Sequence, residues 1–150
     1  MFYIDVPRSP AIQVEEKAES AQLSLTNNNE TKILYIEDIP ANVELVKTVL
    51  NYRQEVRLLA ASTALAGIEL AQSEFPDLIL MDIHLPDMGG LVAFKKLQTI
   101  NETKDIPVIA LTSDAMDVDI KKALAMGFKD YLTKPIDVPR FLEAIDKVLA

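Results

Sequence analysis

Cysteine is absent from the 150-residue sequence, which removes disulfide scaffolds, thiol catalysis and thiolate metal sites from consideration together. Basic charge is also scarce. The 23 acidic residues outnumber the 15 lysines and arginines, and the formal net charge is −8 at pH 7. A nucleic-acid-binding protein would carry a basic stripe or patch, so we expect no nucleic-acid partner.

Long apolar runs are missing as well. None approaches the roughly 20 residues needed to span a bilayer, so we expect no direct membrane contact. The amino terminus lacks the basic region and apolar stretch of a signal peptide, which favours a soluble cytoplasmic protein. No glycine-rich phosphate loop follows any apolar run, and this counts against a nucleotide-binding module.

Composition divides the chain near Lys32. Residues 8–31 are rich in Glu, Ser, Gln, Thr and Asn and contain no aromatic side chain. Such a composition predicts a linker or loosely ordered arm over residues 1–31, with a short helix over 12–23 as an alternative. Residues 32–150 have the apolar content of one folded domain.

Short apolar runs alternate with amphipathic segments from Lys32 onward. The alternation predicts five βα units, and therefore an α/β fold with a doubly wound, five-stranded parallel sheet and helices on both faces. The predicted strands are residues 33–36, 56–59, 78–81, 108–111 and 131–132.

The polarity of the runs predicts the strand order. The first, third and fourth runs are wholly apolar, as expected for strands that are buried on both faces. The second run is broken by Arg57, and the fifth is short and flanked by charged residues, so these two are the expected edges. The flavodoxin-like order 2-1-3-4-5 satisfies this pattern and places the topological switch point between strands 1 and 3.

The segment between the second and third runs has a helical period. Leu65, Ile68 and Phe75 share one face of that helix, which we expect to be buried. Ser62 or Thr63 is expected to cap its amino terminus.

Three carboxylates follow the two strands that flank the predicted switch point. Glu37 and Asp38 come directly after the first strand, and Asp82 comes after the third. At an effective dielectric constant near 20, two unit charges about 4 Å apart repel by roughly 4 kcal/mol, so such a cluster needs a cation or a proton. Oxygen ligands of this kind suit Mg²⁺. The alternative is that each acid ends a strand as a solvated turn residue.

Two further polar residues end the fourth and fifth strands. Thr112 ends the fourth, and the fifth runs into Lys134. Alone, each is more often an ordinary strand or surface residue. Together they could reach an anion on Asp82, with the lysine as a charge-assisted donor.

Four segments together resemble the receiver domain of two-component response regulators, over about Lys32–Ala150. The resemblance depends on the whole set and its order, since no single segment would suffice. The segments are Glu37-Asp38, Met-Asp-Ile-His-Leu-Pro-Asp-Met-Gly-Gly at 81–90, Ala-Leu-Thr-Ser at 110–113 and Lys134-Pro135.

The resemblance implies a phosphoacceptor and a metal site. Asp82 would accept a phosphoryl group. Asp38 would bind Mg²⁺ directly, Glu37 would help, often through water, and the backbone carbonyl of His84 would complete the protein ligands. His84 is an uncommon side chain at that position.

The resemblance also implies a phosphoryl-responsive group. Lys134 would pair with the phosphoryl oxygens, Thr112 would move to donate a hydrogen bond to them, and Tyr131 would turn inward at the same time. The bond before Pro135 would be cis, although only about 5–6% of bonds preceding proline are cis in folded proteins. Gly89 stands where relatives often carry a polar residue.

The function implied is a signalling switch of a phosphorelay. Its partner would be a histidine-phosphorylated kinase or phosphotransfer domain, the chain would be a monomer or weak dimer, and it would not turn over substrate. Phe2–Pro7 looks like the closing strand of a histidine-kinase ATP-binding domain, and residues 38–42 resemble receivers attached to hybrid kinases. We therefore expect the carboxyl-terminal receiver of a hybrid sensor histidine kinase.

Two alternatives remain. One is a free-standing, single-domain response regulator. The other is a phosphatase of the haloacid-dehalogenase type, which also uses an aspartate nucleophile and Mg²⁺. Such enzymes carry Asp-x-Asp after the first strand, whereas here Asp82 follows the third strand and His84 occupies the second acid position.

Overall fold

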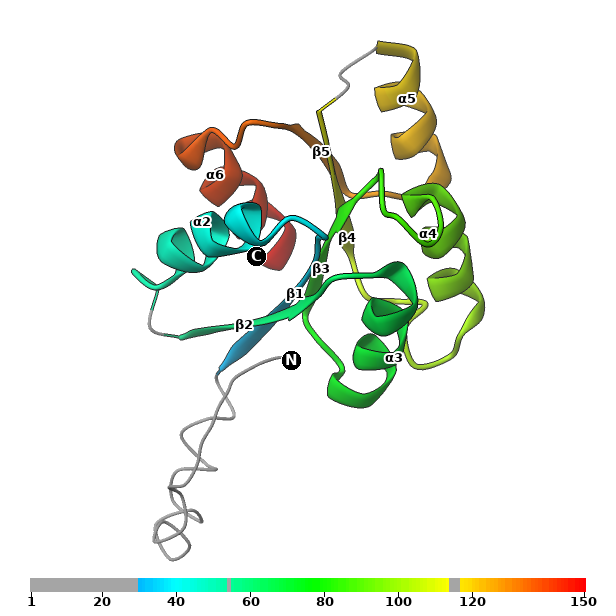
Figure 1. The fold of residues 1–150 in the computed structure, drawn as a ribbon, viewed down its shortest axis with the longest axis horizontal. Coiled ribbons are helices and arrows are strands. Elements are labelled where there is room, and N and C mark those ends of the chain that lie inside the picture. The colour runs from blue at the N-terminus through cyan, green and yellow to red at the C-terminus, as the bar shows by residue number, and fades with distance from the viewer. Residues whose placement is uncertain (1–29, 54, 114–116) are drawn as a thin grey trace, which may run out of the picture.

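A computed structural model of the chain describes residues 30–53, 55–113 and 117–150 (Figure 1). The segment Phe2–Pro7 and the helix considered over residues 12–23 lie outside the described residues. So does the expected linker, apart from Glu30 and Thr31. The first strand begins at Thr31, one residue before the expected domain boundary.

Strands and helices alternate through the described part of the chain, as the sequence predicts. Each predicted strand is present, and most extend by one or two residues beyond the apolar run. The elements are β1 (Thr31–Ile36), α2 (Pro40–Leu50), β2 (Val56–Ala61), α3 (Ala64–Glu74), β3 (Leu78–Asp82), α4 (Gly90–Thr99), β4 (Val108–Thr112), α5 (Asp117–Met126), β5 (Asp130–Thr133) and α6 (Val138–Leu149).

The five strands form one parallel sheet in the order β2-β1-β3-β4-β5, which confirms the predicted order. Every residue of β3 and β4 is buried, whereas β2 buries only its last residue, Ala61. The edge positions of β2 and β5 follow from their polarity, because a parallel strand that is covered on both faces must be apolar throughout.

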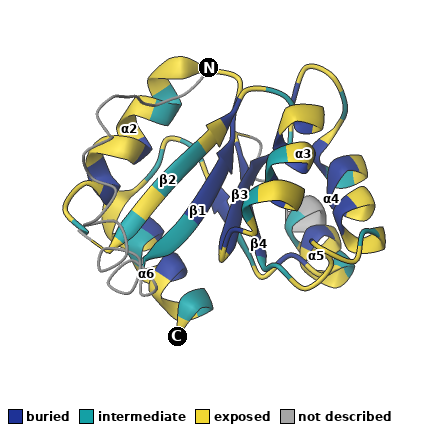
Figure 2. Cartoon of the chain, turned by 90° about the horizontal axis from the view of Figure 1, so that it is seen from below, coloured by how far each residue is buried: buried dark blue, intermediate teal, exposed yellow. Residues whose placement is uncertain are grey.

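Helices cover both faces of the sheet. Helices α2 and α6 lie on one face, and α3, α4 and α5 lie on the other (Figure 1). Successive side chains of a strand point to opposite faces, so Ile33 and Tyr35 of β1 pack on the α2–α6 side and Leu34 and Ile36 on the other. Figure 2 shows the resulting buried layer of strands between helices whose outer faces are exposed. Within the described residues, no helix is long and apolar enough to cross a bilayer.

The expectation for α3 is partly wrong. Leu65 and Phe75 are exposed, and the buried face consists of Ile68 and small residues. The helix lies so close to β1 that a Cβ atom at Gly67 would be 2.6 Å from Cγ1 of Ile36. This close approach turns the small residues toward the sheet and the larger ones outward. Phe75 follows the helix in the left-handed region, with φ of 51°, and so leaves the helical face.

The amino terminus of α3 is capped as predicted. The hydroxyl oxygen of Thr63 accepts a hydrogen bond of 3.1 Å from the backbone N–H of Ala66. A second cap comes from another part of the chain: the carboxylate of Asp87 accepts hydrogen bonds from the backbone N–H groups of Ala64 and Leu65, at 2.8 and 2.9 Å. Asp87 belongs to the β3–α4 loop, so this cap ties that loop to α3.

Candidate functional site

The site lies at the carboxyl ends of the central strands. Ile36 and Met81 are register partners in β1 and β3, and the residues that follow them are Glu37 and Asp82. Parallel strands end at the same edge of a sheet, so adjacent registers bring the two acids side by side. The sequence prediction of a site at this edge rested on the same geometry.

The three predicted acids do form one cluster. Carboxylate oxygens of Glu37, Asp38 and Asp82 lie within 4.8 Å of one another. Asp38 is exposed, whereas Glu37 and Asp82 are only 2% and 4% exposed. Two of the three charges are therefore removed from water, which makes their repulsion more costly than on an open surface.

Lys134 supplies the positive charge of the cluster. Its Nζ lies 2.6 Å from Oε1 of Glu37 and 3.1 Å from Oδ2 of Asp82. The backbone also fixes its position, because the N–H of Lys134 donates to the carbonyl of Thr112 at 2.8 Å. The bond between Lys134 and Pro135 is cis, the isomer that the resemblance implies. One ammonium is thus shared between two buried carboxylates, and it lies closer to Glu37.

Hydrogen bonds orient both buried carboxylates. Oδ1 of Asp82 accepts from the backbone N–H of His84 at 2.9 Å, and Oε2 of Glu37 accepts from the N–H of Ile39 at 3.2 Å. The hydroxyl of Tyr35 donates to Oε1 of Glu37 at 2.8 Å. The sequence reasoning missed Tyr35, although its position two residues before Glu37 puts both side chains on one face of the strand.

The pKa shifts show which carboxylate is less well neutralised. For Asp82, burial is the largest influence, and with the nearby charge of Glu37 it raises the pKa despite the donors His84 and Lys134. Burial acts in the same direction on Glu37, but the hydrogen bonds from Lys134 and Tyr35 outweigh it and lower the pKa. For Lys134, burial alone would lower the pKa, and the two carboxylates reverse this and raise it. Lys134 therefore neutralises mainly Glu37, and Asp82 keeps a poorly compensated charge.

The β3–α4 loop is held close behind Asp82. A Cβ atom at Gly90 would lie 2.8 Å from the carbonyl oxygen of Asp82 and 2.7 Å from Cα of Ile83, so only glycine fits there. The N–H of Gly90 also donates to the carbonyl of Ile83 at 2.7 Å. Gly89 is the residue at the N-cap position of α4, and no side chain caps the helix there.

The remaining predicted residues lie on the two neighbouring strands. Thr112 is buried at the end of β4, one residue beyond Leu111, the register partner of Asp82. Tyr131 lies on β5 and packs, partly buried, against the core on the α3–α5 side. The structure therefore brings Thr112 to the rim beside Asp82, while the responses predicted for Thr112 and Tyr131 stay predictions.

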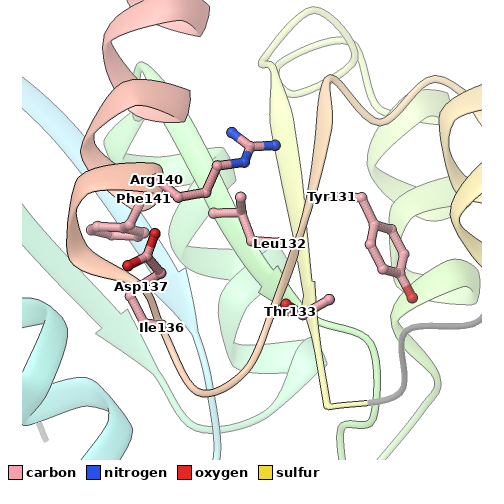
Figure 3. A pocket seen from close by; sticks show the side chains of 7 residues that line it. All are labelled: Tyr131, Leu132, Thr133, Ile136, Asp137, Arg140 and Phe141. Carbon is pink, nitrogen blue, oxygen red and sulfur yellow. The ribbon is translucent and has the colours of Figure 1, made fainter.

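A pocket of about 100 Å³ lies beside β5 and the start of α6 (Figure 3). In that view the ring of Tyr131 lies on one side of the strand, and Asp137, Arg140 and Phe141 lie on the other. None of the cluster acids lines this pocket. It is therefore separate from the acidic site.

The acidic cluster fits a hard divalent cation. Its side-chain ligands are all oxygen atoms, two of the three carboxylates are buried, and one side faces solvent through Asp38. Mg²⁺ prefers oxygen ligands and usually keeps several waters, so one or two carboxylates with an open side suffice.

Comparison with known proteins identifies the family of the chain. A family model for the response regulator receiver domain matches residues 33–146. The chain belongs to this family, whose members act in two-component signalling.

Particular relatives are similar over most of the chain. The polar-differentiation response regulator DivK of Brucella ovis is 37% identical over 117 residues, which cover 78% of this chain and 94% of that protein. Among solved structures, a similar one is the receiver domain of sensor histidine kinase PA1611 from Pseudomonas aeruginosa, with a magnesium ion coordinated in its active site cleft. It is 27% identical with a TM-score of 0.72, and the match covers 80% of this chain and 98% of that one. The chemotaxis response regulator CheY4 of Vibrio cholerae, 22% identical, shares the fold with a TM-score of 0.73 over 80% of this chain and 99% of that one.

Proposed function

We propose that this receiver domain accepts a phosphoryl group from a phosphohistidine on the carboxylate of Asp82. The observation that carries the proposal is the state of that carboxylate. It is buried at the end of a central strand, held by the N–H of His84, and touched by an ammonium that lies closer to Glu37. It is thus oriented and poorly neutralised, as a nucleophile should be.

In the transfer, an oxygen of Asp82 attacks the phosphorus while the bond from phosphorus to the histidine nitrogen breaks. The electron pair of that bond stays on the imidazole, and the product is an acyl phosphate. Positioning and charge stabilisation supply most of the rate in such transfers. Lys134 is close enough to turn from the carboxylates to the new phosphoryl oxygens. When bound by Glu37, Asp38, Asp82 and the carbonyl of His84, Mg²⁺ would neutralise negative charge on those oxygens.

The acyl phosphate would then bias a conformational change. It adds charge and acceptor oxygens at a rim where Thr112 is buried one residue beyond the register partner of Asp82. Movement of the Thr112 hydroxyl toward those oxygens, with an inward turn of Tyr131, would alter the face formed by β4, α5 and β5. Thr112→Ala should therefore accept phosphate while losing most of that response.

The experiment is phosphorylation by acetyl phosphate, followed by intact-mass measurement. With Mg²⁺, the wild-type chain should gain one phosphoryl group, and with a chelator it should gain none. Asp82→Asn is the matched variant, because it keeps size and removes the nucleophile. Equal labelling of Asp82→Asn would overturn the assignment. Continuous release of phosphate far beyond one equivalent per chain would indicate a phosphatase instead.

We also propose that this domain is the receiver of a hybrid sensor histidine kinase and that it works in the cytoplasm. One support is the similarity to the receiver domain of a sensor histidine kinase. The other is that residues 38–42 resemble receivers attached to hybrid kinases. A free-standing regulator is the second candidate. The match covers 94% of DivK, so that relative is little more than a receiver. An antibody against this domain would distinguish them in the source cells, since a hybrid kinase would migrate far above the mass of this chain.

A further inference from the structure

Tyr35 carries a buried phenol that the proposed chemistry does not use. The residue is fully buried in the apolar strand β1, among side chains that pack under α2 and α6. A buried tyrosine hydroxyl normally needs a hydrogen-bond partner. Here the partner is Oε1 of Glu37, at 2.8 Å, so the hydroxyl of a core residue reaches a carboxylate of the site.

The same carboxylate oxygen has a second donor. Nζ of Lys134 lies 2.6 Å from Oε1 of Glu37 and also 3.1 Å from Oδ2 of Asp82. The two donors differ in mobility. The ring of Tyr35 is packed in the core and has two rotatable side-chain bonds, whereas the ammonium of Lys134 ends a flexible four-carbon stem. Of these two donors, only Lys134 can therefore move away from Oε1 of Glu37.

We propose that Tyr35 is a positioning residue for the metal and phosphoryl site, holding Glu37 in place when Lys134 turns to the phosphoryl oxygens. The inference rests on the proposed function. Without the hydroxyl, and with Lys134 turned away, Oε1 of Glu37 would lose both of these donors. Among the described residues, the carboxylate would then keep the N–H of Ile39, at 3.2 Å on its other oxygen. A buried carboxylate held at one oxygen can rotate away from the metal position.

The expected size of the effect follows from other metal sites. Partners that hold a metal-binding side chain typically change metal affinity by about 10- to 100-fold when they are removed. Glu37 is one of several ligands, and Ile39 still holds it, so the lower end of this range applies. Tyr35→Phe should raise the dissociation constant for Mg²⁺ about tenfold while Lys134 is turned to a phosphoryl mimic. It should raise it less in the free protein, where Lys134 still pairs with Glu37.

The experiment is Mg²⁺ titration followed by amide NMR, with and without saturating beryllofluoride, a phosphoryl mimic. Tyr35→Phe keeps the ring and removes only the hydroxyl. Tyr52→Phe is the matched control, since Tyr52 is 85% exposed and follows the carboxyl-terminal end of α2. Urea unfolding in chelator shows that each variant is folded. A hydroxyl that only stabilised the core would change unfolding and leave Mg²⁺ affinity unchanged.

The outcomes separate this inference from the proposed function. Weaker Mg²⁺ binding by Tyr35→Phe, larger with beryllofluoride and absent in Tyr52→Phe, supports it. Mg²⁺ affinity of Tyr35→Phe within about twofold of wild type overturns the inference and leaves the proposed function intact. A loss that is no larger with beryllofluoride also overturns it, because the hydroxyl then does not replace Lys134. Failure of the wild-type protein to bind Mg²⁺ overturns both.

Discussion

Two groups of charges in the molecule use the same kinds of side chain in opposite surroundings. Arg53 and Asp146 form a surface pair between the end of α2 and α6, with a shortest distance of 2.7 Å and side chains that are 30% and 56% exposed. At the carboxyl rim of the sheet, Lys134 pairs with Glu37 and Asp82, and their side chains are 15%, 0% and 6% exposed. The shortest distances are similar, so the two groups differ mainly in burial and in the number of carboxylates for each cation.

Burial changes what each group contributes. Water screens the surface pair, and such pairs typically stabilise a fold by about 0–1 kcal/mol. The rim cluster is removed from water, where desolvation opposes the Coulomb attraction, and it holds two carboxylates for one ammonium. A surplus buried charge is a poor way to stabilise a fold. Its presence at the switch point is therefore better explained by function.

Replacing Lys134 should have the largest effect on stability. Lys134→Met leaves Glu37 and Asp82 facing each other without a cation. We expect the free energy of unfolding to fall by about 3 kcal/mol, the lower end for breaking a buried pair, because Tyr35 and Ile39 still hold Glu37. Urea unfolding in chelator measures this change. A loss below about 1 kcal/mol would place the rim cluster in the same class as the surface pair.

Removing the surplus charge should act in the opposite direction. Asp82→Asn keeps the size of the side chain, relieves its repulsion with Glu37 and leaves Lys134 one carboxylate. We expect the protein without metal to become more stable by about 0.5–2 kcal/mol, as is common where function opposes stability. Saturating Mg²⁺ should stabilise the wild-type protein more than the variant. If Asp82→Asn is less stable than wild type in chelator, the rim carries no surplus repulsion.

The advantage of Asp82→Asn should depend on pH. Folding raises the pKa of Asp82 above its ordinary 3.8, chiefly through burial, so the fold disfavours the ionised form. The resulting penalty is complete above the folded-state pKa and disappears below the unfolded value. The stability difference should therefore be largest at neutral pH and shrink as the pH falls through the folded-state pKa toward 3.8. The lowered pKa of Glu37 makes a contribution of opposite sign to the pH dependence of stability. That contribution is present in both proteins, whereas the contribution of Asp82 is present only in wild type.

This dependence is measured by urea unfolding of both proteins at a series of pH values from about 7 to about 4, in chelator. A difference that stays constant over the series would mean that the charge of Asp82 is not the cause of the strain.

The surface pair should give the smallest effect. Arg53→Met removes a charge from the same kind of short contact as Lys134→Met, but in water. We expect a change of at most about 0.5 kcal/mol, which should shrink further in high salt. The measurement is urea unfolding in low and high salt, beside Lys134→Met. A loss as large as that of Lys134→Met would show that burial does not distinguish the two groups.

Much of the fold, and the place of the acidic cluster, could be predicted from the sequence. The polarity of the strands predicts their order, and the order predicts which strand ends meet. Arg57 identifies an edge strand by its charge alone. With the order known, the ends of β1 and β3 meet at one rim, and Glu37, Asp38 and Asp82 must meet there too. These predictions needed only the period of a strand and the geometry of a parallel sheet.

The parts that could not be predicted depend on contacts between distant segments. Helical spacing alone cannot show that Gly67 lets α3 approach Ile36, which turns Leu65 outward. Similarly, Tyr35 has the pattern of an ordinary core residue. Its role depends on a hydroxyl that reaches Oε1 of Glu37. The second side-chain donor to that oxygen, Lys134, lies 97 residues further along the chain than Glu37.

The central claim is that Asp82 itself carries the phosphoryl group, and mapping the acyl phosphate tests this most directly. The chain is treated with acetyl phosphate and Mg²⁺, reduced with borohydride to convert a phosphorylated aspartate to homoserine, and mapped by tandem mass spectrometry of its peptides. The account predicts conversion at Asp82 alone, with no conversion in chelator. Conversion at Asp38 or another acid while Asp82 stays unmodified would contradict it.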